Sequence, residues 1–343
     1  MKHRLAFLYN VRHRYPDPSD QQSHKEADFD DPGTISAMIS HLKSIGEDVL
    51  PVEANEDAYE ILKKHRKAIN LVFNYSLGIN GKDRYAHIPA ICEMLEIPYT
   101  GSSPLTQATV MTKAQTKTIC KAYGIPTLPW QVFERETQDL EAKLEFPLIV
   151  KPIAQGSSAG ITNESVVKNK RELKKQITFI LDTFNEPALV EPFIRGREFS
   201  VGLLGNPPRI LPIIEADHST LPKGYEPLDS LEVKWIVEEQ ASSNHLICPA
   251  IVPPSLREKL ESMCLSLWNA LNIQDFCRMD VRCDLQGNPF ILEVNSPPGL
   301  IPPEISKTGY LPVQAKYSGM SYDELLKNIL LIARKRLGIY LYR

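Results

Sequence analysis

The sequence lacks an excess of charge of either sign, since 39 lysines and arginines stand against 42 aspartates and glutamates and the formal net charge is -3. Such a balance provides no basic surface of the kind that binds nucleic acid or an anionic membrane. The chain also lacks an apolar run long enough to cross a bilayer, because Asn10, Arg12 and His13 interrupt the one near its start. We therefore expect a cytoplasmic protein with small-molecule partners, and no nucleic acid or membrane partner.

Cysteine pairs and the common glycine motifs for nucleotides are absent too. The six cysteines include no CxxC pair and several fall in apolar patterns, so we expect buried thiols in a reducing compartment. Cys277 and Cys283 have no matching His/Cys pair, which argues against zinc. No GxGxxG follows the first expected strand, and residues 155–160 lack the Lys-Ser/Thr ending of a P-loop. A dinucleotide site and a Walker site are therefore not expected.

The composition that is present, 343 residues with 43% hydrophobic and 24% charged residues, is that of a globular chain of two or three domains. Strands expected at 4–9, 48–52 and 69–74 alternate with helices at 31–46 and 56–67, which is the βαβαβ order of an α/β domain. A helix near 86–95 and a short strand at 97–100 complete a first domain that ends near Ser102. The polar segment 12–30 is expected to be a surface loop that could fold over a site.

A helix expected at 103–123 carries Lys113, Lys117 and Lys121 on one face, a pattern that is usually just solvated. The strand expected at 147–152 then places Lys151 before the Gly/Ser loop 155–160. A lysine followed by such a loop suits a polyphosphate, because the lysine supplies charge and the loop supplies backbone N–H groups. Taken alone, the loop is most often a linker.

Three further segments complete the expected order. Residues 191–194 combine extended backbone with Phe193, features that an adenine could use. Residues 217–245 are long, polar and rich in turn residues, so a mobile loop is expected there. Helices are expected at 255–271, from its leucine spacing, and from the capping box at Ser321 to about residue 337.

Residues 278–299 predict two strands joined by a polar turn, because apolar and polar residues alternate with a period of two. A turn at 285–288 pairs Asp284 with Pro289, and the same register sets Asp280 opposite Glu293. One face then carries residues 279, 281, 283, 290, 292 and 294, and the other carries Arg278, Asp280, Glu293 and Asn295.

Two carboxylates opposed across strands repel each other unless a cation lies between them. The hairpin could also be a half-exposed one whose polar face meets only water. The acid pair, the carboxamide of Asn295 and the run Ser-Pro-Pro-Gly that ends at Gly299 favour a metal site. Mg²⁺ (or Mn²⁺) is the expected ion, because it is held by one or two carboxylates together with substrate phosphates. Arg278 would add a fixed positive charge beside those phosphates.

Taken in order, these motifs resemble those of the ATP-grasp carboxylate–amine ligases, most closely the D-alanine–D-alanine ligase group. The resemblance covers most of the chain from about residue 97 to 337 and implies an ATP-grasp fold of three domains, expected at 1–102, 103–187 and 188–343. It implies ATP gripped between the second and third domains. A homodimer is compatible with it.

The resemblance also implies roles for single residues. ATP-binding positions are Lys113, Lys151, Gly156, Ser158, Glu191, Phe193, Ile194 and Glu198, with Glu191 and Glu198 at the positions for adenine and ribose. Metal positions are Asp280, Glu293 and Asn295, and catalytic positions are Ser157, Lys234, Arg278 and Gly299. Trp235, next to the loop lysine, replaces a common tyrosine and is a candidate for substrate contact.

The implied chemistry is attack of a substrate carboxylate on the γ-phosphate, followed by displacement of phosphate from the acyl phosphate by an amine. Two departures concern the substrates. The family has a glutamate after the first strand that binds the first amino group; it is missing here, and Asp30 or Asp31 could substitute. The family also has a serine after Gly299 that holds the acceptor's carboxylate; it is missing too, and Glu304 would repel a carboxylate there. A D-alanine–D-alanine ligase, a ligase for other substrates and a non-catalytic ATP-binding regulator all remain open.

Overall fold

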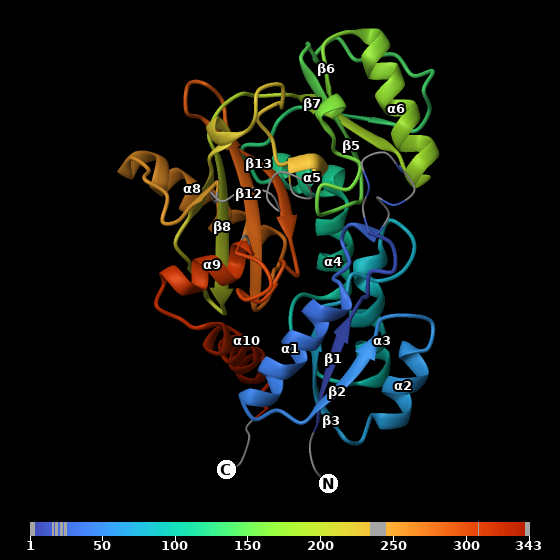
Figure 1. Ribbon diagram of the computed structural model, residues 1–343, viewed down its shortest axis with the longest axis vertical. Coiled ribbons are helices and arrows are strands. Elements are labelled where there is room, and N and C mark those ends of the chain that lie inside the picture. Colours follow the sequence, from blue (N-terminus) through green and yellow to red (C-terminus); the bar gives the residue numbers. More distant parts are fainter. Residues whose placement is uncertain are drawn as a thin grey trace.

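The computed structural model of the chain describes residues 4–15, 17, 20, 23, 26–233, 245–307 and 309–339, and its elements are arranged as Figure 1 shows. Lys234 and Trp235 lie outside the described residues. The described strands form three sheets, which follow one another along the chain. No helix of the described part is both long and apolar enough to cross a membrane.

The first sheet has the strand order β2-β1-β3 and is parallel throughout. Its elements are β1 (Arg4–Tyr9), α1 (Pro32–Ser44), β2 (Val49–Glu53), α2 (Ala58–His65), β3 (Ile69–Asn74), η2 (Arg84–Ala86) and α3 (His87–Leu95). The expected βαβαβ order is confirmed, and Asp31 caps α1 by accepting from the backbone N of Thr34 at 3.0 Å. The short strand expected at 97–100 is reduced to a bridge between Val72 and Tyr99.

The helix expected at 103–123 is in fact two helices, α4 (Pro104–Met111) and α5 (Lys113–Ala122). Thr112 between them is extended, with φ -86° and ψ 98°. The backbone N of Lys113 donates to the carbonyl of Ile153 at 3.0 Å, so a bond to a distant part of the chain replaces the helical one. This break sets the direction in which α5 starts.

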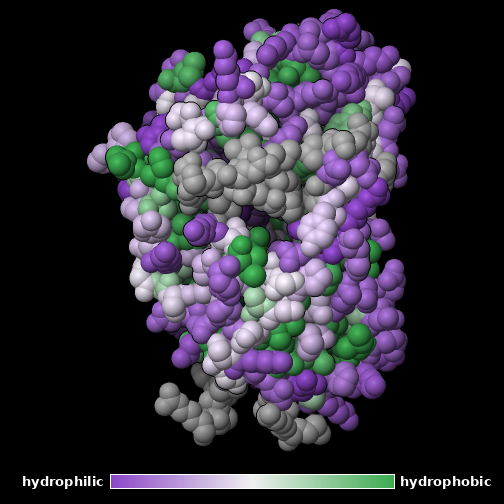
Figure 2. Space-filling view, viewed as in Figure 1, coloured by the Kyte–Doolittle hydropathy of each residue, from purple (hydrophilic) through white to green (hydrophobic). Residues whose placement is uncertain are grey.

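The second sheet has the strand order β4-β7-β5-β6. Its elements are β4 (Gln131–Phe133), β5 (Leu148–Pro152), η3 (Asn163–Ser165), β6 (Val166–Val167), α6 (Lys170–Phe184) and β7 (Ala188–Pro192). Because β7 pairs with both β4 and β5, this sheet continues past residue 187, where the second expected domain ends. Its helix α6 presents a hydrophilic surface at the upper right of Figure 2.

The third sheet has the order β11-β10-β8-β12-β13, with β9 paired to β8. Its elements are β8 (Glu198–Gly205), β9 (Pro208–Ile210), β10 (Ile214–Ala216), η4 (His218–Thr220), β11 (Leu246–Ile247), α8 (Pro254–Ala270), β12 (Phe276–Cys283), β13 (Pro289–Asn295), α9 (Tyr310–Tyr317) and α10 (Tyr322–Arg336). The expected helix at 255–271 and the capping box of the last helix are confirmed. The helix α10 packs against α1, so the first and last parts of the chain lie side by side (Figure 1).

The hairpin of β12 and β13 has the expected opposition of Asp280 to Glu293 at one end, but a different register at the other. A bulge after Asp280 shifts the pairing, so that Pro289 faces Cys283 and not Asp284. Beyond the bulge the side chains of β13 exchange faces. Ile291, expected on the polar face, therefore lies in the hydrophobic core with Val294.

All six cysteines are free thiols, and five of them are buried, as expected from their apolar surroundings. Two expected surface segments prove to be partly packed. In segment 12–30, Ala27 and Asp28 are buried, and in segment 217–245, Leu228 and Leu231 are buried. Ala27 and Leu231 both belong to the core of the second sheet, so a described part of each segment packs against it.

Candidate active site

Asp280 is the centre of the polar face of the hairpin. Its carboxylate accepts hydrogen bonds from Arg278 Nε at 2.9 Å and Nη2 at 2.8 Å, from the amide of Asn295 at 2.9 Å, and from the hydroxyl of Ser200 on β8 at 2.6 Å. Arg278 and Asn295 were expected here from the register, but Ser200 was not. Ser200 faces Asp280 because β8 pairs with β12 in that register.

The guanidinium of Arg278 lies between Asp280 and the ring of Tyr310, whose centroid is 4.7 Å away. Burial alone would lower the pKa of Arg278, but Asp280 outweighs burial and raises the pKa above its usual value. The side chain is therefore a permanent cation with two of its sides held. A cation held in this way is suited to face charge that develops on a substrate.

Three lysines gather opposite the hairpin, on α5 and β5. Lys117 and Lys151 both contact the buried carboxylate of Glu191 on β7, Lys117 at 2.5 Å. Burial would raise the pKa of Glu191, but the two lysines lower it to about 2. Lys117 is fully buried and also donates to Thr127 at 3.0 Å. The expectation that Lys117 belongs to a solvated row is therefore wrong, whereas Lys121 is exposed as expected.

Lys113 connects the hairpin to the Gly/Ser loop. Its Nζ lies 3.4 Å from the carboxylate of Glu293 and donates to the backbone carbonyl of Gln155. Lys113 is 4% exposed, so it too departs from the expected solvated row. The structure therefore brings Lys113 and Glu293, which come from motifs 180 residues apart, into one site.

The Gly/Ser loop is held at its base by residues that the motif itself does not include. The backbone N of Gly156 donates to Asp28 at 2.9 Å, and a Cβ on Gly156 would lie only 2.7 Å from that carboxylate. Arg84 donates to Asp28 and to the carbonyl of Ala154, both at 3.0 Å. Asp28 and Arg84 are buried. Nothing in the spacing of the sequence points to this pair, because Asp28 lies in a turn and Arg84 opens the short helix η2, far away in the chain.

The two serines of this loop have different surroundings. Ser157 and Ser158 both have positive φ, 46° and 60°, which is uncommon for residues other than glycine. Ser157 is exposed, while Ser158 is buried and donates to the backbone carbonyl of Asp229. The hydroxyl of Ser157 therefore remains accessible to a ligand.

The segment expected to receive adenine is more enclosed than the sequence suggests. The ring of Phe193 is 6% exposed, with the guanidinium groups of Arg195 and Arg282 each 5.1 Å from its centroid. Its backbone N donates to the carbonyl of Pro147 at 2.9 Å. Ile194 next to it is half-buried. Contact with an adenine would therefore use the backbone around residue 194 and not the face of the aromatic ring.

Glu198 at the start of β8 contacts Arg282 at 3.0 Å and His218 at 3.2 Å. Burial would raise the pKa of Glu198, but His218 and Arg282 lower it below its usual value. Glu198 is therefore an anion at neutral pH, and its orientation is set by two neighbours. An ionised carboxylate in this position can accept hydrogen bonds from hydroxyl groups.

The turn at Gly299 is held by two tyrosines. The backbone N of Leu300 donates to the hydroxyl of Tyr75 at 3.1 Å, and the carbonyl of Leu300 accepts from Tyr322 at 2.6 Å. Asp30 also faces Tyr75, and its burial raises its pKa to about 6. The turn that follows the hairpin is thus joined to the first sheet.

Asp31 and Glu304, two of the three acidic residues that the sequence connected with the substrates, have partners inside the protein. Both carboxylate oxygens of Asp31 lie near Thr34 of α1, as a helix cap requires. Glu304 is half exposed and contacts His41 of α1 at 2.8 Å. A positive charge on His41 would weaken the repulsion that Glu304 was expected to exert on a carboxylate.

The residues around Asp280 fit a magnesium ion only with ligands added by a substrate. Among the described residues there is no group of three or more His, Cys, Asp and Glu side chains that could hold a metal ion. Asp280 and Glu293 are nevertheless opposed on adjacent strands, and Asn295 lies against Asp280. Two carboxylates and an amide are hard oxygen donors, which suit Mg²⁺ when phosphate oxygens complete its shell.

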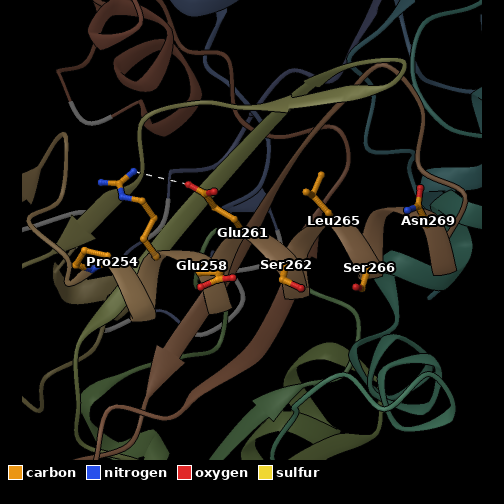
Figure 3. A pocket seen from close by; sticks show the side chains of 8 residues that line it. Pro254, Glu258, Glu261, Ser262, Leu265, Ser266 and Asn269 are labelled. Carbon is orange, nitrogen blue, oxygen red and sulfur yellow. Dashed lines mark ion pairs between the residues drawn. The ribbon is translucent and has the colours of Figure 1, made fainter.

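A hollow of about 490 Å³ lies elsewhere, along the outer side of α8. Figure 3 shows the residues that line it, among them Glu258, Glu261 and Ser262, and all of them belong to this one helix. None of the site residues described above lines it. Since no second element of the described part of the chain contributes to its lining, this hollow has no opposite wall there against which a ligand could be enclosed.

A first α/β sheet, lysines presented by α5 and the second sheet, and carboxylates presented by the third sheet together define an ATP-grasp protein. A family model for the D-ala D-ala ligase C-terminus matches residues 119–331. The D-alanine–D-alanine ligase of Pelotomaculum thermopropionicum is 32% identical, covering 89% of this chain and 92% of that protein. An uncharacterised protein, y4sG, of Sinorhizobium fredii is also 32% identical, covering 88% and 87%. The crystal structure of the Bacillus anthracis D-alanine–D-alanine ligase complexed with ATP is similar at a TM-score of 0.72 and 23% identity, covering 98% and 99% of the two chains.

The chain belongs to the D-alanine–D-alanine ligase family. It is an ADP-forming ligase that uses ATP to join a carboxylate to an amine, and its substrates are small molecules. The expected fold and reaction class are therefore confirmed.

Proposed function

We propose that the protein activates the carboxylate of an amino acid as an acyl phosphate and joins it to an amine, with D-alanine as the first candidate for the carboxylate substrate. The observation that carries the proposal is the position of Asp280, Glu293 and Arg278 opposite the lysines of α5 and β5. Carboxylates for a metal ion and lysines for phosphates then face one space. The relatives named D-alanine–D-alanine ligase support the choice of D-alanine.

In this proposal Lys113 and Lys151 hold the phosphates, together with the backbone of the Gly/Ser loop. Asp280, Glu293 and Asn295 would hold Mg²⁺, which neutralises phosphate charge when it is bound. Arg278 faces the acyl group and stabilises its negative oxygen, because its guanidinium is held in place before the substrate arrives. No side chain needs to form a covalent bond, since positioning and electrostatics suffice for acyl transfer through a phosphate.

We also propose that the acceptor amine is not bound as a free amino acid with its carboxylate beyond the Gly299 turn. The backbone N of Leu300 already donates to Tyr75. Pro302 and Pro303 have no N–H group to donate. With these donors missing, an acceptor whose carboxylate is amidated, or one that is larger or cationic, should be used better than free D-alanine.

The test is a coupled ADP-release screen of amino acids of both configurations, singly and in pairs, with D-alanine amide included as an acceptor. Product masses identify which carboxylate and which amine are joined. Amino-acid-dependent ADP release is the expected result, and its complete absence would favour a non-catalytic ATP-binding regulator. Faster use of free D-alanine than of its amide would contradict the proposal about the acceptor while leaving the ligase reaction in place.

Three coarser proposals accompany this function. The three sheets suggest three domains, with the second including β7, so that its end lies near residue 192 and not 187. A cytoplasmic location fits the free cysteines and the ATP requirement. A homodimer remains the proposed assembly, and size-exclusion chromatography with light scattering would test it.

A further inference from the structure

Asp229 joins the Gly/Ser loop and α9 to two histidines of its own segment, 217–245. Its backbone carbonyl accepts from Ser158 of the Gly/Ser loop, and its side-chain Oδ2 accepts from the hydroxyl of Tyr310 at 2.5 Å. His218 Nδ1 lies 3.7 Å and His245 Nε2 lies 3.5 Å from its other oxygen. The side chain of Asp229 is only 12% exposed. A carboxylate in such surroundings has a restricted position.

Tyr310 contacts both Asp229, through its hydroxyl, and Arg278, through its ring. Tyr310 is the first residue of α9, and the centroid of its ring lies 4.7 Å from the guanidinium carbon of Arg278. On the other side of Arg278, Nε and Nη2 donate to Asp280. The ring therefore restrains the guanidinium on a second side. A cation over an aromatic face is attracted to it, so the ring also favours this one orientation.

We propose that Tyr310 and Asp229 are positioning residues for Arg278, and that through Ser158 they couple the orientation of Arg278 to the Gly/Ser loop. The inference rests on the proposed function, in which Arg278 stabilises the oxygen of the acyl group. It goes beyond that function because neither residue belongs to the ATP or metal motifs. A loop that has closed on phosphates would thereby keep Arg278 in place for the acyl step.

The orientation of the Arg278 guanidinium depends on two contacts, one with Asp280 and one with the ring of Tyr310. Asp280 holds Arg278 from within the same strand, and this contact alone leaves rotation about the long side chain partly open. The Tyr310 ring removes that freedom only if the ring itself is held, which the hydroxyl bond to Asp229 achieves. Because hydrogen bonds to a charged group are stronger than neutral ones, this bond is the sensitive point of the arrangement.

The experiment is a double-mutant cycle of Tyr310→Phe and Asp229→Ala in the full-length protein, assayed by ADP release. The probe is D-alanine, or whichever amino acid gives the highest rate in the screen described above. Tyr310→Phe keeps the ring but removes the hydroxyl, and we expect kcat to fall at least about tenfold while the KM for ATP changes less than about twofold. Asp229→Ala should lower kcat by a similar factor. The kcat of the double variant should be little lower than that of either single variant, since both changes remove the same hydrogen bond.

Two further variants separate positioning from a general structural role. Tyr310→Leu removes the ring as well, and its kcat should be lower than that of Tyr310→Phe by roughly threefold or more. Tyr317→Phe on the same helix is the matched control, because Tyr317 is 56% exposed, and it should keep the wild-type rate. Asp229→Asn retains an oxygen acceptor for Tyr310 and should recover part of the rate if Asp229→Ala is too unstable to assay.

A second measurement does not depend on turnover. In a proton–nitrogen NMR spectrum, the side-chain Nε–H signal of Arg278 can be assigned by its loss in Arg278→Lys. This signal should be sharp in the wild type. In Tyr310→Phe and Asp229→Ala it should be broadened, or its proton should exchange faster with water. An unchanged Arg278 signal in both variants would overturn the inference, and so would a wild-type kcat in Tyr310→Phe or strictly additive losses in the double variant. Absence of ADP release from the wild type with every amino acid would instead count against the proposed function, and the Arg278 signal would still decide the inference.

Discussion

Replacing Glu191 by glutamine should destabilise the protein, because it removes the carboxylate that two buried lysines share. Lys117 is fully buried and Lys151 is 6% exposed, and both contact Glu191. The lysines lower the pKa of Glu191 from its usual value of 4.5 to about 2. At about 1.4 kcal/mol for each tenfold change in acidity, this difference corresponds to about 3 kcal/mol in favour of the folded, ionised state.

The cluster as a whole stabilises by less than this figure, because burial lowers the pKa of Lys117 and Glu191 restores it only in part. Removing one partner of a buried ion pair nevertheless costs roughly 3–5 kcal/mol, since an uncompensated charge stays behind. We therefore expect Glu191→Gln to lose about 3 kcal/mol of unfolding free energy at pH 7. The same change at Glu164, an exposed partner of Lys175, should have little effect and is the control.

Urea unfolding followed by circular dichroism, between pH 7 and pH 4, measures the effect. Because the folded pKa of Glu191 is depressed, its contribution is fully present above about pH 4.5 and is lost as the pH falls from there toward about 2. The difference between wild type and variant should therefore be constant from pH 7 to 5 and begin to shrink near pH 4. Equal urea midpoints for Glu191→Gln and wild type at pH 7 would show that the ionised carboxylate of Glu191 does not stabilise the fold.

Asp280→Asn should leave the circular dichroism spectrum unchanged and abolish ADP release, and near-normal rates at saturating magnesium would place the metal elsewhere. Lys151→Ala should weaken ATP binding in calorimetry, because water does not replace the lost charge at a phosphate, and an unchanged affinity would count against the assignment. Burial lowers the pKa of His41, but Glu304 and Asp323 raise it above its usual 6.5. The stability that this raised pKa contributes is present below about pH 6.5 and is lost as the pH rises through the folded value. In urea unfolding, His41→Gln should therefore be less stable than wild type near pH 6, and the difference in unfolding free energy should be smaller near pH 9. A difference that grows with pH would contradict this prediction.

The elements of the first sheet could be predicted from the sequence because local patterns decide them. A buried strand, a capped helix at Asp31 and a glycine at its end follow one another at short range, and their pairing in a parallel sheet follows from the alternation of strands and helices. The capping box at Ser321 is equally local. In the hairpin the expected opposition of Asp280 to Glu293 is found, but it depends on the bulge after Asp280, because the pairing next to the turn differs by one residue from the expected one.

Other features depend on atoms far away in the chain, and no local pattern encodes them. Lys117 has the spacing of a solvated row, yet Glu191 of β7 makes its burial possible. The break at Thr112 exists because the backbone of Lys113 bonds to Ile153. The bulge after Asp280 lets Ile291 enter the core, and the alternation of residues around it gives no sign of this.

The order of the elements, the motifs of the site and, through their resemblance to a family, the reaction class could all be read from the residues in chain order. Which of those motifs meet, and which side chains hold them, depends on how the three sheets pack together. Asp28 at the base of the Gly/Ser loop lies in a turn, and Tyr310 over Arg278 lies at the start of the short helix α9. The position of both residues depends on packing between the sheets. Periodicity reports which face of an element is buried, but not which distant side chain will lie against it.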